Sequence, residues 1–305
     1  MKNNIRKIET IRDFHTMRGL SSPQHPLISL IDYVDTDILP EHIGEQWHFN
    51  FYSIGVKRNV GTLRYGQQNY DFDEGLMSFI APGQLLHIKP NSRANKKPSG
   101  WLLLIHPDFI WKSTLAKTIH QYEFFNYAIN EALFMSPKEE TLINGIFSNI
   151  KNEIESTIDS FSQNILIAQI ELLLQYSERF YQRQFITREK KNHEVLGRLE
   201  DVLTELLNSK NTTNKGLPSV KEIADLLHLT PNYLSSLLKS LTGKNTQQFI
   251  HEKLIEKAKE KLATTNLSIT EIAYEFGFEH SQSFSKLFKS KTNISPSEFR
   301  SKFHA

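Results

Sequence analysis

Two sets of polar and basic residues in the last third of the chain have matching positions in a repeated pattern. The first set is Asn232, Tyr233, Ser235, Ser236 and Lys239, and the second is His280, Ser281, Gln282, Ser285 and Lys286. Asn and Gln side chains can bond adenine through two hydrogen bonds, Lys suits the acceptor atoms of guanine, and Ser adapts to several bases. Lys239, Lys244 and Lys289 suit phosphate contacts, which position a protein without reading sequence. Any one of these residues could also belong to an ordinary solvated face, but their paired placement favours base reading.

The elements that must position these side chains also occur twice. Residues 219–224 (SVKEIA) return as residues 268–273 (SITEIA), an offset of 49, and Phe249 returns as Phe299, an offset of 50. Each copy begins with a predicted capping box, in which a serine and a glutamate three residues later satisfy free amides at a helix start. The sequence therefore predicts two helix-turn-helix units, at residues 219–242 and 268–291.

Apolar residues at helical spacing define the inner side of each copy. Alanine at positions 224 and 273 is expected where two helices cross closely, and Gly277 follows where a turn favours positive φ. His228 holds the equivalent place in the first copy. The predicted inward residues are Ile223, Ala224, Leu227, Leu234, Leu237 and Leu238 in the first copy, and Ile272, Ala273, Phe276, Phe284, Leu287 and Phe288 in the second.

Residues 251–262 join the copies and read as a stiff helix with Glu and Lys four residues apart. Such a helix would fix the distance between the two outward faces. If these faces enter successive major grooves of a duplex, we expect them about one DNA turn, roughly 34 Å, apart.

The composition permits this interpretation and excludes several others. The 305 residues carry a formal net charge of +2, and residues 190–305 hold 17 Lys and Arg against 13 Asp and Glu. A weakly basic C-terminal part is compatible with DNA binding without requiring it. The absence of cysteine rules out disulfides, thiolate catalysis and cysteine-bound zinc. No signal peptide or long apolar segment is evident in the sequence, so we expect a cytoplasmic protein that does not enter a membrane.

The first part of the chain has a different pattern. Between about residues 26 and 107, short aromatic and β-branched runs alternate with turn residues, which is typical of a small antiparallel barrel or sandwich. Residues 136–181 then read as two helices, the first opened by Ser136 and Pro137. The apolar stripe of Ile165, Ala168, Leu172 and Tyr176 suits packing on the chain's own sheet, and it equally suits pairing with a second protomer.

The C-terminal part resembles the AraC-type (AraC/XylS) transcription regulators. The residues that carry the resemblance include 219–224, Leu234 with Ser235, Ala258 with Leu262, Ile272 with Ala273, Gly277 with Phe278, 282–285 (QSFS) and 295–300 (SPSEFR). It covers about residues 190–303. Two positions depart from the family pattern: Asn293 replaces a usual glycine, and Leu254 stands where many members have arginine.

The resemblance implies a cupin-like N-terminal barrel that binds an effector and mediates dimers. We therefore predict an α+β chain with a sensor and dimerisation domain at residues 1–182, a linker at 183–193 and a DNA-binding domain at 194–305. Trp47, Arg64, Tyr70, His87 and Trp101 are the candidate effector-binding residues. No cofactor or metal is expected, since His48 lacks the second histidine and the glutamate of a cupin metal site.

The sequence thus predicts a sequence-specific transcription regulator rather than an enzyme. Its expected partners are double-stranded DNA, a small-molecule effector, RNA polymerase and a second copy bound through residues 136–181. The alternative is a metal-dependent cupin-type enzyme with a helical accessory domain, which bound metal in the purified protein would identify.

Overall fold

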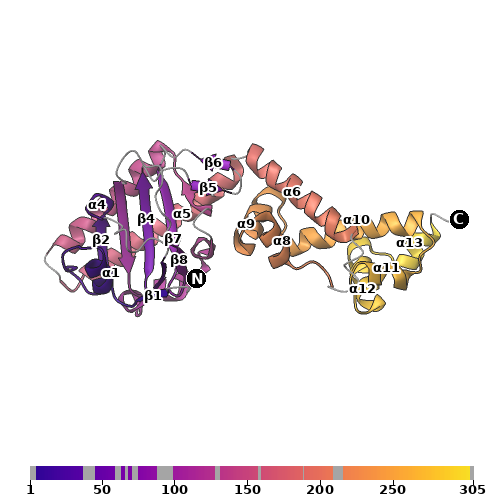
Figure 1. The fold of residues 1–305 in the computed structure, drawn as a ribbon, viewed down its shortest axis with the longest axis horizontal. Helices are drawn as coiled ribbons and strands as arrows, with labels where there is room; N and C mark the ends of the chain where they lie inside the picture. The colour runs from indigo at the N-terminus through magenta and orange to yellow at the C-terminus, as the bar shows by residue number, and fades with distance from the viewer. Residues whose placement is uncertain are drawn as a thin grey trace. The chain divides into compact units, whose positions relative to one another are not determined.

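The computed structural model describes residues 5–36, 45–58, 63–65, 68–70, 75–87, 99–127, 131–156, 159–187, 189–208 and 216–302. Within it the chain divides into two compact units, an N-terminal unit, Met1–Gln184, and a C-terminal unit, Phe185–Ala305. Figure 1 shows strands in the first unit and helices alone in the second. The α+β class predicted from the sequence is confirmed.

The strands of the N-terminal unit are short. They are β1 Ile5–Ile8, β2 Ile28–Asp32, β3 Gln46–Phe49, β4 Tyr52–Arg58, β5 Leu63–Tyr65, β6 Gln68–Tyr70, β7 Leu76–Ile80, β8 Leu85–His87, β9 Ser99–Ile105 and β10 Leu133–Phe134. The helices of this unit are α1 Ile11–Met17, α2 Pro107–Ile110, α3 Leu115–Thr118, α4 Pro137–Glu155 and α5 Ser162–Thr187, with short 3₁₀ turns η1 Tyr33–Asp35, η3 Ile119–Gln121 and η4 Glu123–Asn126.

The described strands pair into three separate sheets. The largest is antiparallel with the order β10-β7-β4-β9-β2, a second has the order β1-β3-β8, and β5 pairs with β6. In the second sheet β1 and β3 are parallel, which a simple meander cannot produce. The predicted closed barrel is not confirmed, because no strand pairing joins these sheets within the described residues.

Strand β9 is buried on both faces, as its continuous apolar run predicts. Leu102 and Leu104 belong to a cluster with aromatic residues of α1, β3 and the following turn, whereas Leu103 and Ile105 point to the opposite face. On the sheet's helical side, Ser177 of α5 lies beside Met77 of β7, and Figure 1 shows α5 crossing behind the strands.

Helix α4 begins as the sequence predicts. Ser136 accepts a hydrogen bond from the Glu139 amide, the Glu139 carboxylate accepts one from the Ser136 amide, and Pro137 fills the first helical position. Helix α5 then runs to Thr187, and α6 begins at Glu189, so both helices extend into the polar segment at 183–193. The predicted domain boundaries stay a prediction.

The C-terminal unit consists of helices. They are α6 Glu189–Asn208, α8 Val220–Leu227, α9 Pro231–Thr242, α10 Thr246–Thr264, α11 Ile269–Glu275, α12 Ser281–Thr292 and α13 Pro296–Ser301. Helix α6 packs on α8, and α10 contacts helices of both repeats. Leu254 and Ala258 of α10 lie in one apolar cluster with Ile272, Phe284 and Phe288 of the second repeat. Leu254 therefore fills a core position where many AraC-type regulators have arginine.

Candidate nucleic-acid interface

The second repeat forms a well-capped helix-turn-helix from α11 and α12. Ser268 and Glu271 exchange two hydrogen bonds, with the Glu271 amide 3.1 Å from the Ser268 hydroxyl oxygen and the Ser268 amide 2.6 Å from the carboxylate. The turn passes through Gly277 at φ +82°, where an added Cβ would lie 2.5 Å from the backbone of Gly216. Both the box and the positive φ are as predicted, and together they fix the angle between α11 and α12.

Helix α12 turns its aromatic residues inward and its polar residues outward. Phe284 and Phe288 are fully buried, and the predicted inward residue Leu287 packs against the same cluster. Gln282, Lys286 and Lys289 are exposed at positions i, i+4 and i+7, so they share one face of the helix. His280 at the N-cap is exposed as well, while Ser281 and Ser285 are half-buried. This face of α12 thus leaves an amide and two ammonium groups open to solvent.

The first repeat forms a helix-turn-helix from α8 and α9 with weaker local signals. Ser219 caps α8 by accepting from the Glu222 amide, and His228 adopts a left-handed conformation at φ +58° where the second repeat has glycine. Of the two hydrogen bonds in the predicted capping box, only the one that the Ser219 hydroxyl accepts is found among the described residues. Thr230 caps α9, and Pro231 fills its first helical position.

The outward face of α9 is only partly exposed. Asn232 and Lys239 are exposed, whereas Tyr233 and Ser235 are half-buried. Ser236 is 9% exposed, so its predicted placement in solvent is wrong. The helical period alone would leave it outside, because Leu234, Leu237 and Leu238 form the inner side of α9.

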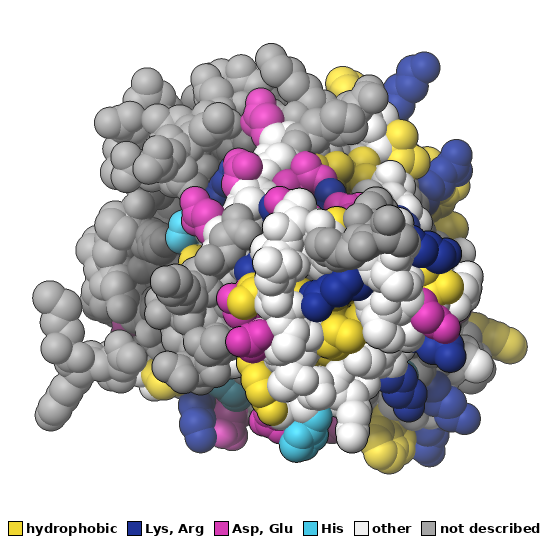
Figure 2. Space-filling model, turned by 90° about the vertical axis from the view of Figure 1, so that its right-hand side faces the viewer, with side chains coloured by type: hydrophobic (Ala, Val, Ile, Leu, Met, Phe, Trp, Pro, Cys, Tyr) yellow, Lys and Arg dark blue, Asp and Glu magenta, His cyan; other side chains and the backbone are white. Residues whose placement is uncertain are grey.

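Lysines surround the helix-turn-helix units, but they are not equally available. Lys244, predicted to contact phosphate, forms an ion pair of 2.5 Å with Glu252 of α10. Lys257 pairs with Glu260 and Lys253 with Glu256, so the pairs described along α10 are three residues apart rather than four. Figure 2 shows one face of the molecule with Lys and Arg gathered mainly on its right-hand side and most Asp and Glu on the left and top.

The candidate effector residues of the N-terminal unit are spread over different strands. Trp47 is buried in the core, and its Nε1 donates a 2.9 Å hydrogen bond to Glu45. His87 lies in β8 opposite Gln46, and Arg64 and Tyr70 lie in the β5–β6 hairpin. The side chains of these three residues are outside the described part. Trp101 is half-buried, and Lys151 of α4 lies 5.5 Å from its ring.

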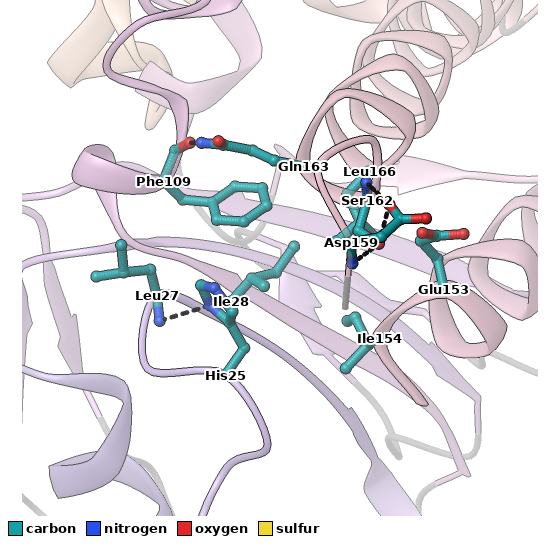
Figure 3. A pocket seen from close by; sticks show the side chains of 10 residues that line it. All are labelled: His25, Leu27, Ile28, Phe109, Glu153, Ile154, Asp159, Ser162, Gln163 and Leu166. Atoms are coloured by element: carbon teal, nitrogen blue, oxygen red, sulfur yellow. Dashed lines mark hydrogen bonds between the residues drawn. The ribbon is translucent and has the colours of Figure 1, made fainter. Parts of the chain in front are cut away.

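A pocket of about 290 Å³ lies elsewhere in the N-terminal unit. Figure 3 shows its ten lining residues: His25, Leu27, Ile28, Phe109, Glu153, Ile154, Asp159, Ser162, Gln163 and Leu166. None of the five predicted effector residues is among them. The ten lining residues come from the start of β2 and the segment before it, from α2, from the end of α4 and from the start of α5 with the residue Asp159 before it. Sequence spacing does not predict that these segments meet.

Two polar groups of this pocket, Asp159 and His25, have a lowered pKa. The Asp159 carboxylate accepts hydrogen bonds from the Phe161 and Ser162 amides, and these bonds lower its pKa. Burial lowers the pKa of His25, whose Nδ1 accepts from the Leu27 amide. The pocket therefore combines an apolar floor, a neutral imidazole and an ionised carboxylate.

Neither a metal site nor a membrane-spanning helix occurs in the part of the chain that the structure describes. No group of three or more His, Asp or Glu side chains there could hold a metal ion. Among the helices of the same residues, none is long and apolar enough to cross a membrane.

Comparison with known proteins finds a family match in the C-terminal unit. A family model described as a helix-turn-helix domain matches residues 223–302. Over 145 residues the chain is 31% identical to YfiF, an uncharacterized HTH-type transcriptional regulator of Bacillus subtilis, covering 47% of this chain and 42% of that protein. It is 34% identical over 90 residues to the HTH-type transcriptional activator AarP of Providencia stuartii, covering 30% of this chain and 65% of AarP.

A solved structure is also similar. The C-terminal domain of the two-component response regulator yesN from Fusobacterium nucleatum is 29% identical, covers 35% of this chain and 98% of that chain, and has a TM-score of 0.31. The chain covers less than two thirds of the length of either curated relative, YfiF or AarP. The similarity to these two relatives therefore applies to less than half of this chain.

Proposed function

We propose that this chain, whose C-terminal unit carries a helix-turn-helix domain of the AraC-type transcription regulators, regulates transcription by binding specific DNA. The supporting observation is the α12 face, where Gln282, Lys286 and Lys289 stand exposed on a helix fixed from behind by buried phenylalanines. A helix of this kind fits the major groove, where each base pair presents a distinct pattern of donors and acceptors.

Salt dependence of DNA binding tests this proposal. We expect the affinity for a duplex selected from random DNA to fall steeply with salt, because each neutralised phosphate releases counterions. Replacing both Lys286 and Lys289 by Ala should make the slope of log K against log salt shallower by about 0.9 for each phosphate that is no longer neutralised. Lys138→Ala removes an exposed cation of α4 and should leave the slope unchanged. Binding without preference for the selected duplex would refute specific recognition.

The N-terminal unit is proposed to sense a small molecule through the pocket of Figure 3. An apolar floor with a few fixed polar groups is the usual composition of a small-molecule site, and Asp159 favours a ligand that carries a positive charge. Leu166→Trp, which fills the pocket, should abolish any effect of cell metabolites on DNA affinity. An undiminished effect would place the effector elsewhere.

The N-terminal unit is also proposed to pair with a second copy through α5. Leu166, Ile170 and Leu173 form a buried face of α5, while another face leaves Ile165 and Leu172 exposed, together with Phe161 just before the helix. The sequence pattern suits packing of α5 on the chain's own sheet and equally suits pairing with a second protomer. Because α5 has both a buried and an exposed apolar face, it can do both. RNA polymerase is a further proposed partner, as expected of a regulator bound beside a promoter.

A further inference from the structure

The two outward helix faces of the C-terminal unit differ in exposure at equivalent positions. With the offset of 50 residues, Ser236 of α9 corresponds to Lys286 of α12, and Tyr233 corresponds to Ser283. Lys286 and Ser283 are exposed, whereas Ser236 is 9% exposed and Tyr233 is half-buried. The outward face of the first repeat is therefore covered in part, at Ser236 and Tyr233, while Asn232 and Lys239 stay exposed.

The repeat's own core does not cover this face. With 3.6 residues per turn, Ser236 lies about 200° around the helix from Leu234. Leu234, Leu237 and Leu238 face the core of the repeat, so Ser236 lies on the far side of α9 and Tyr233 lies on its flank, about 40° around the helix from Leu237. Tyr233 and Ser236 are three residues apart and thus neighbours on one surface of α9.

Phe185, in the last turns of α5, packs against this surface. Its side chain is 1% exposed, and its ring lies edge-on to the Tyr233 ring with centroids 5.2 Å apart at 69°. The Asn192 side chain of α6 donates a hydrogen bond to the Phe185 carbonyl, which ties the end of α5 to α6. Phe185 belongs to the C-terminal unit by its contacts, although it continues a helix that begins at Ser162.

We propose that Phe185 is an internal blocking residue that covers Tyr233 on the DNA-reading face of the first helix-turn-helix. This rests on the proposed function of the chain as a DNA-binding regulator. In the conformation described, α12 is free to enter a major groove, whereas α9 must first separate from Phe185. The helix that carries Phe185 also carries the pocket residues Ser162, Gln163 and Leu166 near its start.

Tyrosine accessibility tests the packing of Phe185 on Tyr233 without DNA. Mild nitration followed by peptide mass analysis should modify Tyr233 more slowly than Tyr274, an exposed tyrosine of α11, in the wild-type chain. Phe185→Ala should raise the rate at Tyr233 toward that of Tyr274. Ile186→Ala changes the next residue, which is 63% exposed, and should leave both rates as they are. Equal rates at the two tyrosines in the wild type, or no change in a folded Phe185→Ala chain, would overturn the proposal.

Folding is controlled with a second variant. Phe185→Leu keeps an apolar side chain but removes the edge-on ring pair, so it should show a smaller rise in Tyr233 nitration. If Phe185→Ala does not fold, Phe185→Leu decides the matter by the same comparison.

DNA binding then tests the blocking role. An edge-on aromatic pair contributes enough free energy to change an equilibrium about two- to tenfold, so Phe185→Ala should bind the wild-type-selected duplex about two- to tenfold more tightly. Its salt dependence should also be steeper, because α9 adds phosphate contacts. Faster nitration with unchanged DNA affinity would overturn the blocking role. If no variant binds DNA, the proposed function fails, and the nitration result still decides whether Phe185 covers α9.

Discussion

At the residue scale, the helical period predicts the exposure of Lys286 correctly but not the burial of Ser236. The period correctly places Gln282 and Lys286 outside and Phe284 and Phe288 inside, because both assignments depend on neighbours three and four residues away. It fails at Ser236, which is buried, and at the neighbouring Tyr233, whose ring packs against Phe185, 48 positions earlier in the chain. The spacing of apolar residues within one helix cannot predict a contact between residues so far apart in the chain. The ion pair of Lys244 with Glu252 likewise joins a residue before α10 to one within that helix, and local spacing does not predict it.

Base discrimination should depend on Gln282 and Lys286. Replacing either by Ala should cost about 1–3 kcal/mol of discrimination against a mismatched base pair at one operator position, because the variant cannot form the two hydrogen bonds to a base edge. Binding of single-mismatch duplexes measures this cost. Lys291→Ala removes another exposed lysine of α12 and should weaken binding to all duplexes alike. Unaltered discrimination in both single variants would remove the two residues from the interface.

At the scale of elements, capping residues allowed most of the helices around the interface to be predicted. The box predicted at Ser268 forms, Ser136 and Ser295 begin their helices with the same box, and Asn293 takes the left-handed conformation, φ +63°, where the family usually has glycine. These are local interactions. The sheet of the N-terminal unit depends on distant partners, such as β1 with β3, so alternation of residues predicted strands but not how they pair.

The cap of α13 should make the C-terminal unit sensitive to acid. The Ser295 amide and hydroxyl donate to the Glu298 carboxylate and lower its pKa below the ordinary value of 4.5. A carboxyl group with a lower pKa in the folded state stabilises the fold at neutral pH, and this contribution is lost as the pH falls through the folded-state pKa. Denaturant unfolding at neutral and acid pH should therefore show a smaller acid loss for Glu298→Gln than for wild type. Glu279→Gln, at an exposed glutamate outside the caps, should behave like wild type, and equal acid losses in all three chains would contradict the cap's role.

At the scale of the whole molecule, the exposed apolar face of α5 bears on assembly. Phe161 is 66% exposed and Trp111, which follows α2, is 74% exposed, values that an apolar surface buried against a second copy would account for. We expect the wild-type chain to sediment as a dimer, and Leu172→Glu to shift it to monomer by placing a charge on this face. Asn149→Glu introduces the same charge at an exposed position of α4 and should leave the dimer intact. A wild-type chain that stays monomeric at high concentration would rule out this surface.

A hydroxyl-radical footprint on the duplex enriched from random DNA most directly tests whether the C-terminal unit recognises DNA as proposed. The expected result is protection on one face of the duplex, with a patch that disappears in the Gln282→Ala, Lys286→Ala double variant. A second patch about one helical turn, roughly 34 Å, away should strengthen when Phe185 is replaced by Ala. Protection that is no greater than on random DNA, or that is unaffected by the α12 changes, would contradict the account.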